Sequence, residues 1–427
     1  MNLLPINPDI VRLRLFERVL IFVMFFLHYS FYGILNINLY FQLPTSIVSG
    51  LVNLTCFLIA LFLVFRDFSR VEYPRFPPSL MCAAFFLIYY LIVFFIDRDV
   101  GTKFYSGFSG RMKVFYDFFI VVFSAFLIYF AGIRRFSYVL SKPMLVFIPS
   151  FITVCIILIL NRYALVSFDL FASTLSFDAS GASGGYLRSA VRRPPMFLIA
   201  ISPYLMFFHR NKFYKFVVGP FGCAAAIVAC LISDSRSTML TFVVVLLFYG
   251  VIAMRNVASF SYALVVYVSG AIVALPAILM SKAFERLLSL GDLARFNMIV
   301  DSGEFGRIEL IKMGLLQFLE NPLLGGNIFL NNTYIPGGWS HCTPITILYT
   351  TGLIGVSLIL VVIGGVFKGM FALYDMFKEK SLWIYALFIV EVGEMFMHGN
   401  TMQFFCGSIA VFLLANAYAI KFGLSRR

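Results

Sequence analysis

Two arginines and one histidine stand where helices of this chain are expected to begin. Arg236 lies within the segment Ser-Asp-Ser-Arg-Ser-Thr, Arg307 opens an amphipathic segment, and His341 follows a serine. A helix N-terminus carries unpaired N–H groups and about half a positive charge, so it favours anions. Arginine adds bidentate binding of phosphate, and a neutral histidine at such an end can accept a proton. The three residues predict a phosphate-binding site that contains a general base.

Three further arginines precede Pro194 and Pro195, at the predicted start of another helix. They are Arg188, Arg192 and Arg193. Proline is suited to the first turn of a helix, so a helix is expected to begin here. The alternation of the apolar segments across the membrane places this helix start on the same side as Arg236 and His341. The arginines are candidates for binding a diphosphate or a glycan. Taken singly, each is also explained by snorkelling toward lipid headgroups.

Two acids lie deep in a late apolar segment. Glu391, Glu394 and His398 are spaced i, i+3 and i+7, so they share one face of a helix. Acids inside a membrane are costly and usually face a cavity or a basic partner. Pairing with one of the arginines, binding of a sugar and a role as a second base therefore all remain open for Glu391 and Glu394.

Other cofactor chemistry leaves no sequence signature here. The histidine and acid pattern lacks a second histidine at i+4, so no metal site is predicted. The chain contains neither a Walker loop nor a dinucleotide fingerprint, so no ATP hydrolysis, no redox cofactor and no other cofactor is expected. Nucleic acid is not expected as a partner either.

The composition predicts an all-α integral membrane protein. Of 427 residues, 61% are hydrophobic and only 12% are charged, which is more apolar surface than a soluble domain can bury. About twelve apolar segments are long enough to cross the hydrocarbon layer, and they form one polytopic domain over residues 1–427. These segments are residues 16–35, 44–65, 79–96, 114–131, 143–160, 194–209, 213–232, 237–254, 259–280, 341–367, 381–397 and 402–420.

The distribution of basic residues predicts the orientation of these segments. Lysines and arginines gather in alternate short loops, which places both termini in the cytoplasm, and the basic start of the chain leads into a retained first helix. The net charge of +13 fits both this bias and an anionic substrate. Two long loops, residues 161–193 and 281–340, fall on the external side. Residues 307–320 of the second have apolar positions at helical spacing and stop before Pro322, which predicts an amphipathic helix across the mouth of the protein.

Three ordered motifs resemble the bacterial O-antigen polymerase and O-antigen ligase superfamily. They are Ser235-Arg-Ser-Thr238; Gly306-Arg307 followed by Glu320-Asn-Pro-Leu-Leu-Gly-Gly326; and His341 followed by Leu348 and Gly352-Leu-Ile-Gly355. Their order and their predicted side of the membrane also match the family. At one place the chain differs, because family members often have His-Asn where this sequence has His341-Cys342.

The resemblance implies a GT-C-like, metal-independent glycosyltransferase of the bacterial inner membrane with its active site facing the periplasm. Its donor would be an undecaprenyl-diphosphate-linked oligosaccharide, and a separate chain-length regulator is a possible partner. Carried over to this chain, Arg236 and Arg307 would hold the diphosphate leaving group, and His341 would deprotonate the acceptor hydroxyl.

Two reaction types fit the same residues. A polymerase transfers the growing glycan to another repeat unit, whereas a ligase transfers it to lipid A–core; the polymerase is favoured here. A transporter or flippase is a third hypothesis, but transporters of this size usually contain two similar halves with binding groups near the midplane. No such repeat is visible in this sequence.

Overall fold

The computed structural model is helical nearly throughout the part of the chain that it describes, and it contains no strand there. This agrees with the predicted all-α fold. The described residues are 13–40, 45–68, 78–96, 127, 129–132, 135–162, 182–233, 236–253, 261, 307–325 and 343–398.

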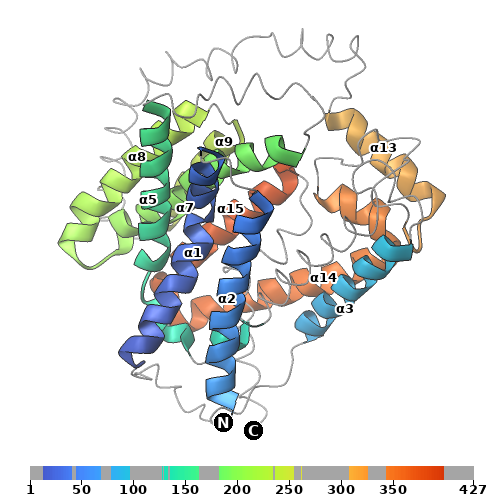
Figure 1. Ribbon diagram of the computed structural model, residues 1–427, viewed down its shortest axis with the longest axis horizontal. Coiled ribbons are helices and arrows are strands. Elements are labelled where there is room, and N and C mark those ends of the chain that lie inside the picture. Colours follow the sequence, from blue (N-terminus) through green and yellow to red (C-terminus); the bar gives the residue numbers. More distant parts are fainter. Residues whose placement is uncertain are drawn as a thin grey trace.

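The helices follow one another without any other regular element among these residues (Figure 1). They are α1 (Leu15–Tyr40), α2 (Thr45–Phe68), α3 (Pro78–Ile96), α5 (Met144–Arg162), α7 (Ala182–Phe208), the π-helix η2 (Tyr214–Val218), α8 (Gly219–Ser233), α9 (Arg236–Ala253), α13 (Arg307–Glu320), α14 (Thr343–Phe377), the 3-10 helix η3 (Lys378–Ser381) and α15 (Leu382–His398).

Several of these helices match the predicted segments closely. The amphipathic helix predicted over 307–320 is α13, and the segment predicted over 79–96 is α3. The segments predicted over 259–280 and 402–420 lie outside the described residues, apart from residue 261, and of the segment predicted over 114–131 only residues 127 and 129–131 are described. Their existence stays a prediction.

Two predicted boundaries are wrong. The helix expected to start at Pro194 begins at Ala182, so Pro194 and Pro195 lie inside α7 and the last twelve residues of the predicted loop 161–193 are helical. A proline inside a helix removes one backbone donor and clashes with the carbonyl four residues earlier, yet α7 continues through both prolines. The segment expected to end at residue 367 continues to Phe377 as α14.

Helix α7 forms the centre of the larger helical group. Every residue from Arg193 to Phe207 is buried, because α1, α5, α8, α9 and α15 surround it. A helix that is apolar on all sides is stable only in such a central position. Tyr249 of α9 is fully buried against it and donates its hydroxyl hydrogen to the carbonyl of Ala200 at 2.7 Å.

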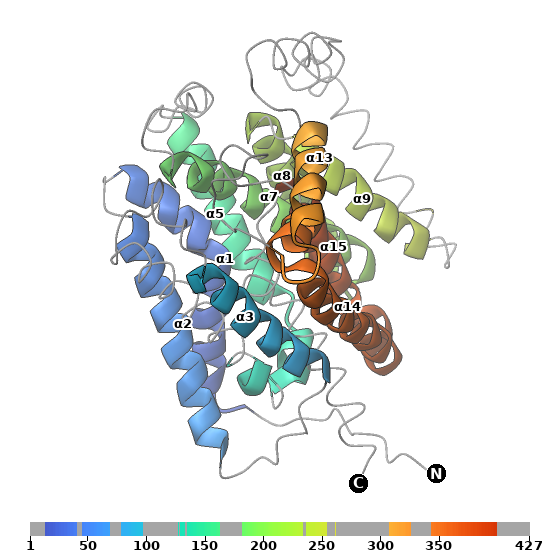
Figure 2. The ribbon, with the colours of Figure 1, turned by 90° about the vertical axis from the view of Figure 1, so that its right-hand side faces the viewer.

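Helices α3, α13 and α14 form a second group, which lies on the right-hand side of Figure 1. Helices α3 and α14 run antiparallel, because Phe86 lies beside Gly355 and Ser79 lies beside Gly365. Figure 2 views the molecule from this side, with α3 and α13 in front of the longer α14.

One helical region in the described part of the chain, Pro344–Gly393, is long and apolar enough to cross a bilayer. It comprises most of α14, all of η3 and most of α15. Shorter apolar helices are Leu54–Arg66, Met144–Ile159, Arg193–Phe208, Tyr214–Cys230 and Thr241–Ala253.

Candidate functional site

The contact between α13 and the first part of α14 is closely packed. Tyr349 of α14 is fully buried, and Met313, Phe318 and Ile345 pack around it. Gly314 allows the close approach, because a Cβ at this position would lie 2.6 Å from Cγ2 of Ile345. The amphipathic helix α13 is thus docked directly on α14.

The turn after α13 is joined to a break in α14 by backbone hydrogen bonds. Gly352 interrupts α14 with φ 59° and ψ −163°, a conformation that is almost restricted to glycine. The second half of α14 therefore begins with N–H groups that have no hydrogen-bond acceptor within the helix. Those of Leu353 and Ile354 donate to the carbonyl oxygens of Pro322 (2.9 Å) and Leu323 (3.3 Å). The two motif segments that contain these residues are consequently in direct contact.

The contact leaves no room for side chains at its two glycines. Gly325, with φ 74°, would place a Cβ 2.5 Å from the carbonyl oxygen of Thr350. A Cβ on Gly352 would lie 2.5 Å from the nitrogen of Gly325 and from the carbonyl oxygen of Leu323. We call this contact the Gly325–Gly352 interlock.

Helix α3 also holds the turn. The hydroxyl of Tyr89 donates to the carbonyl oxygen of Leu324 at 2.6 Å. Three segments that are far apart in the sequence therefore meet at the interlock.

Replacing Tyr89 with phenylalanine should weaken this attachment without changing the packing of the ring. We expect the free energy of unfolding to fall by about 0.5–1.5 kcal/mol, since one hydrogen bond is lost. SDS titration in mixed micelles would measure it. Tyr138→Phe is the matched control, because its ring beside Arg18 is retained; an equal loss in both variants would contradict the role of the Leu324 contact.

The register of α13 on α14 places Arg307 at the same end of the pair as the start of α14. Gly314 lies against Ile345, and Gly325 lies against Gly352, so the two helices run parallel. Arg307 begins α13 about 10 Å before Gly314, and Thr343 begins α14 about 3 Å before Ile345. Both N-termini therefore lie at the same end of the pair. His341 precedes Thr343 by two positions and lies outside the described residues.

Arg236 is the first residue of α9 and belongs to a different group of helices. Helix α9 runs antiparallel to α15, since Thr241 lies near Gly393 whereas Val251 and Leu382 line one shared groove. Arg236 consequently starts α9 at the end where α15 finishes. Glu394 and His398 occupy that last part of α15.

The three arginines predicted to open a helix lie along α7 instead. Arg188 and Arg192 are in its first half, and Arg193 is buried with 6% of its surface exposed. Glu391 is also buried, and it interacts electrostatically with Tyr29 of α1. Arg193 and Glu391 are thus both inside the larger helical group rather than at its surface.

The predicted site residues at helix starts therefore fall into two sets, apart from the arginines of α7 and the buried Glu391. One set comprises Arg307 and the start of α14, and the other comprises the end formed by α9 and α15, with Arg236. The helical hairpin α14–η3–α15 places the start of α14 and the end of α15 away from the η3 turn. Helices α9 and α13 each begin with an arginine, and such an N-terminus provides donors and positive charge for an anion.

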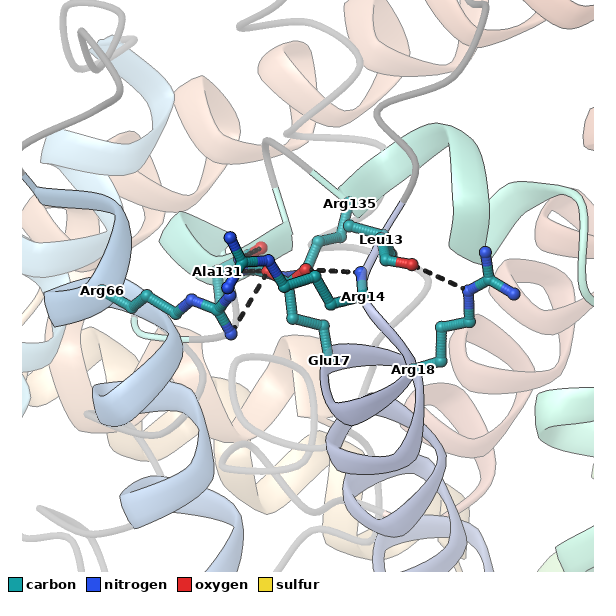
Figure 3. A network of polar contacts seen from close by, with 7 residues as sticks. All are labelled: Leu13, Arg14, Glu17, Arg18, Arg66, Ala131 and Arg135. Carbon is teal, nitrogen blue, oxygen red and sulfur yellow. Dashed lines mark hydrogen bonds and ion pairs between the residues drawn. The ribbon is translucent and has the colours of Figure 1, made fainter.

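A separate charged cluster joins α1, α2 and the helical segment 135–140 (Figure 3). Glu17 and Arg135 are almost completely buried, and Nη2 of Arg135 donates to Oε1 of Glu17 at 2.9 Å. Nη1 of Arg66 lies 3.9 Å from the same oxygen. Oε2 of Glu17 accepts the backbone N–H of Arg14 at 2.9 Å, which caps the start of α1.

Sequence reasoning missed this cluster. It treated the arginines only as markers of membrane orientation, although a local signal existed. Glu17 is the third residue of α1, the position from which a glutamate can bond back to the N-cap backbone. Its pairing with Arg135 is a long-range contact that no local pattern predicts.

Neither a protein-family model nor a curated protein matches this chain. The resemblance described above therefore rests on the motifs, and the contact between two of them is the structural observation that bears on it.

Proposed function

We propose that this protein is a membrane-embedded glycosyltransferase that polymerises undecaprenyl-diphosphate-linked oligosaccharide units at the periplasmic face of a bacterial inner membrane. The observation that carries the proposal is the Gly325–Gly352 interlock. It joins two of the three family motifs and sets Arg307 at the end where α14 begins. His341 precedes this start of α14 by two positions in the sequence.

Exposed apolar stripes support the membrane placement. Met81, Phe85, Ile88 and Ile92 of α3 follow one face at helical spacing and are each about half exposed. Water would penalise such a stripe, whereas lipid chains would solvate it. Leu58, Phe62 and Phe65 continue the same pattern on α2.

The Glu17 cluster supports the proposed orientation. Arg14, Arg66 and Arg135 come from three segments that the distribution of basic residues assigns to the cytoplasmic side. All three contact the same glutamate, so the segments lie at one end of the bundle. In the proposed topology this is the cytoplasmic end, and α13 belongs to the opposite, external side.

In the proposed reaction, a hydroxyl of the acceptor sugar attacks the anomeric carbon of the donor. His341 takes the hydroxyl proton as the new C–O bond forms. The bond from the anomeric carbon to the diphosphate breaks, and undecaprenyl diphosphate leaves with the electron pair. Arg236 and Arg307 stabilise the charge on this leaving group. Arg188, Arg192, Arg193, Glu391 and Glu394 are proposed to support binding of the diphosphate or the glycan.

A complementation experiment tests these roles. Arg236→Ala, Arg307→Ala and His341→Ala would be expressed in a deletion strain, and the glycan ladder would be read on gels. Loss of an electrostatic contact costs about 10²–10³ in rate, and loss of a general base about 10²–10⁴. We therefore expect lipid A–core that carries a single repeat unit.

Arg210→Ala is the matched control, because Arg210 is an exposed arginine in the turn after α7 and should leave a normal ladder. Protein levels in the membrane are compared for all variants. Bare core with polymer retained on the carrier lipid would instead assign the ligase reaction. Normal ladders from all three variants would refute the site.

A further inference from the structure

Helix α13 has an exposed apolar face opposite the one that packs on α14. We call it the leucine face: Leu315 (41% exposed), Leu316 (41%), Leu319 (67%), and Leu323 (59%) and Leu324 (50%) of the following turn. Each leucine left in water rather than in an apolar medium costs up to about 1.5–3 kcal/mol. A patch of this kind marks a surface that contacts another apolar phase.

The leucine face continues into the exposed apolar surfaces of the neighbouring helices. The turn that carries Leu323 and Leu324 is bonded to Ile354 of α14 and to Tyr89 of α3. Ile354 is itself 37% exposed, and Ile88, next to Tyr89, is 53% exposed. The same medium that surrounds α3 and α14 therefore reaches the leucine face.

Polarity changes along α13. Its first half contains Arg307, Glu309 and the exposed Lys312, whereas the leucine face occupies its second half and the following turn. The C-terminal end also lies further along α14, since the interlock is nine residues, or about 13 Å, beyond the start of α14. Glu320 lies at the edge of the leucine face, where its carboxylate accepts the side-chain N–H of Gln317 at 3.4 Å.

We infer that α13 enters the outer leaflet obliquely with its C-terminal end deepest, so that the leucine face contacts lipid acyl chains. The flexible stem of Lys312 then brings its amine to the level of the lipid phosphates. This inference rests on the membrane placement proposed above and does not depend on glycosyl transfer.

Tryptophan quenching by brominated phospholipids tests the depth of α13. The full-length protein would be reconstituted as Leu319→Trp, Lys312→Trp, Phe85→Trp or Lys380→Trp, and the quenching of the unmodified protein would be subtracted. Phe85 reports the apolar stripe of α3, and Lys380 reports the exposed η3 turn. We expect Leu319→Trp to lose most of its added emission in lipids brominated deep in the chain. Lys312→Trp should respond more to lipids brominated near the headgroup.

Quenching of Leu319→Trp no greater than that of Lys380→Trp, with Phe85→Trp strongly quenched, would overturn the inference while leaving the membrane placement intact. Absence of quenching at Phe85 as well would overturn both. Equal quenching of Leu319→Trp and Lys312→Trp at each depth would contradict the oblique entry. None of these readings depends on activity, so a failed glycan-ladder experiment would leave the inference standing.

Discussion

Gly352→Ala should abolish the correct joining of α13 to α14. Alanine in the conformation of Gly352 costs about 1–3 kcal/mol in backbone strain. Its Cβ would also lie 2.5 Å from backbone atoms of Leu323 and Gly325, and such overpacking typically costs about 1–3 kcal/mol more. Backbone atoms cannot move aside as a flexible side chain can, so we expect a large fall in stability and no polymer.

Gly364→Ala is the control for this prediction. Gly364 lies in the same helix, and a Cβ there would meet no atom within 4 Å. Alanine also favours a helix over glycine by about 1 kcal/mol, so this variant should be at least as stable as the unmodified protein. The melting temperature in detergent and the glycan ladder would be measured for both. Equal behaviour of the two variants would show that the interlock does not constrain the fold.

Glu17→Ala, in the first turn of α1, should destabilise the protein nearly as strongly as Gly352→Ala. It would leave the guanidinium of Arg135, which is 1% exposed, without its carboxylate. Removing one partner of a buried ion pair costs about 3–5 kcal/mol, because the remaining charge stays buried. The N-terminal cap of α1 would be lost as well.

A double-mutant cycle separates pairing from packing. In Glu17→Met with Arg135→Met, neither charge of this buried pair remains, and replacement of a buried pair by apolar side chains is often neutral. We therefore expect the double variant to recover most of the stability lost by Glu17→Ala, as measured by SDS titration in mixed micelles. Arg18→Ala removes an exposed arginine and should cost about 1 kcal/mol or less. Additive losses in the cycle would argue against coupling between Glu17 and Arg135.

Local sequence signals predicted most helices correctly. Apolar runs are long, and polar or proline-containing segments bound them, so α3 and α13 were predicted almost to the residue. The stop of α13 before Pro322 is a local effect, since the residue before a proline disfavours the helical conformation. The same reasoning failed at Pro194 and Pro195, which disfavour the interior of a helix locally but are buried inside the central helix α7.

The all-helical class, the apolar segments and the residue types that can bind a diphosphate follow from composition and from spacing within one helix, so they could be predicted locally. The break in α14 depends on long-range contacts, since the N–H groups exposed at Gly352 are paired with carbonyls from the turn after α13. Long-range packing also buries Arg193 and Glu391 and pairs Glu17 with Arg135. Such contacts join residues far apart in the chain, and no local period or propensity encodes them.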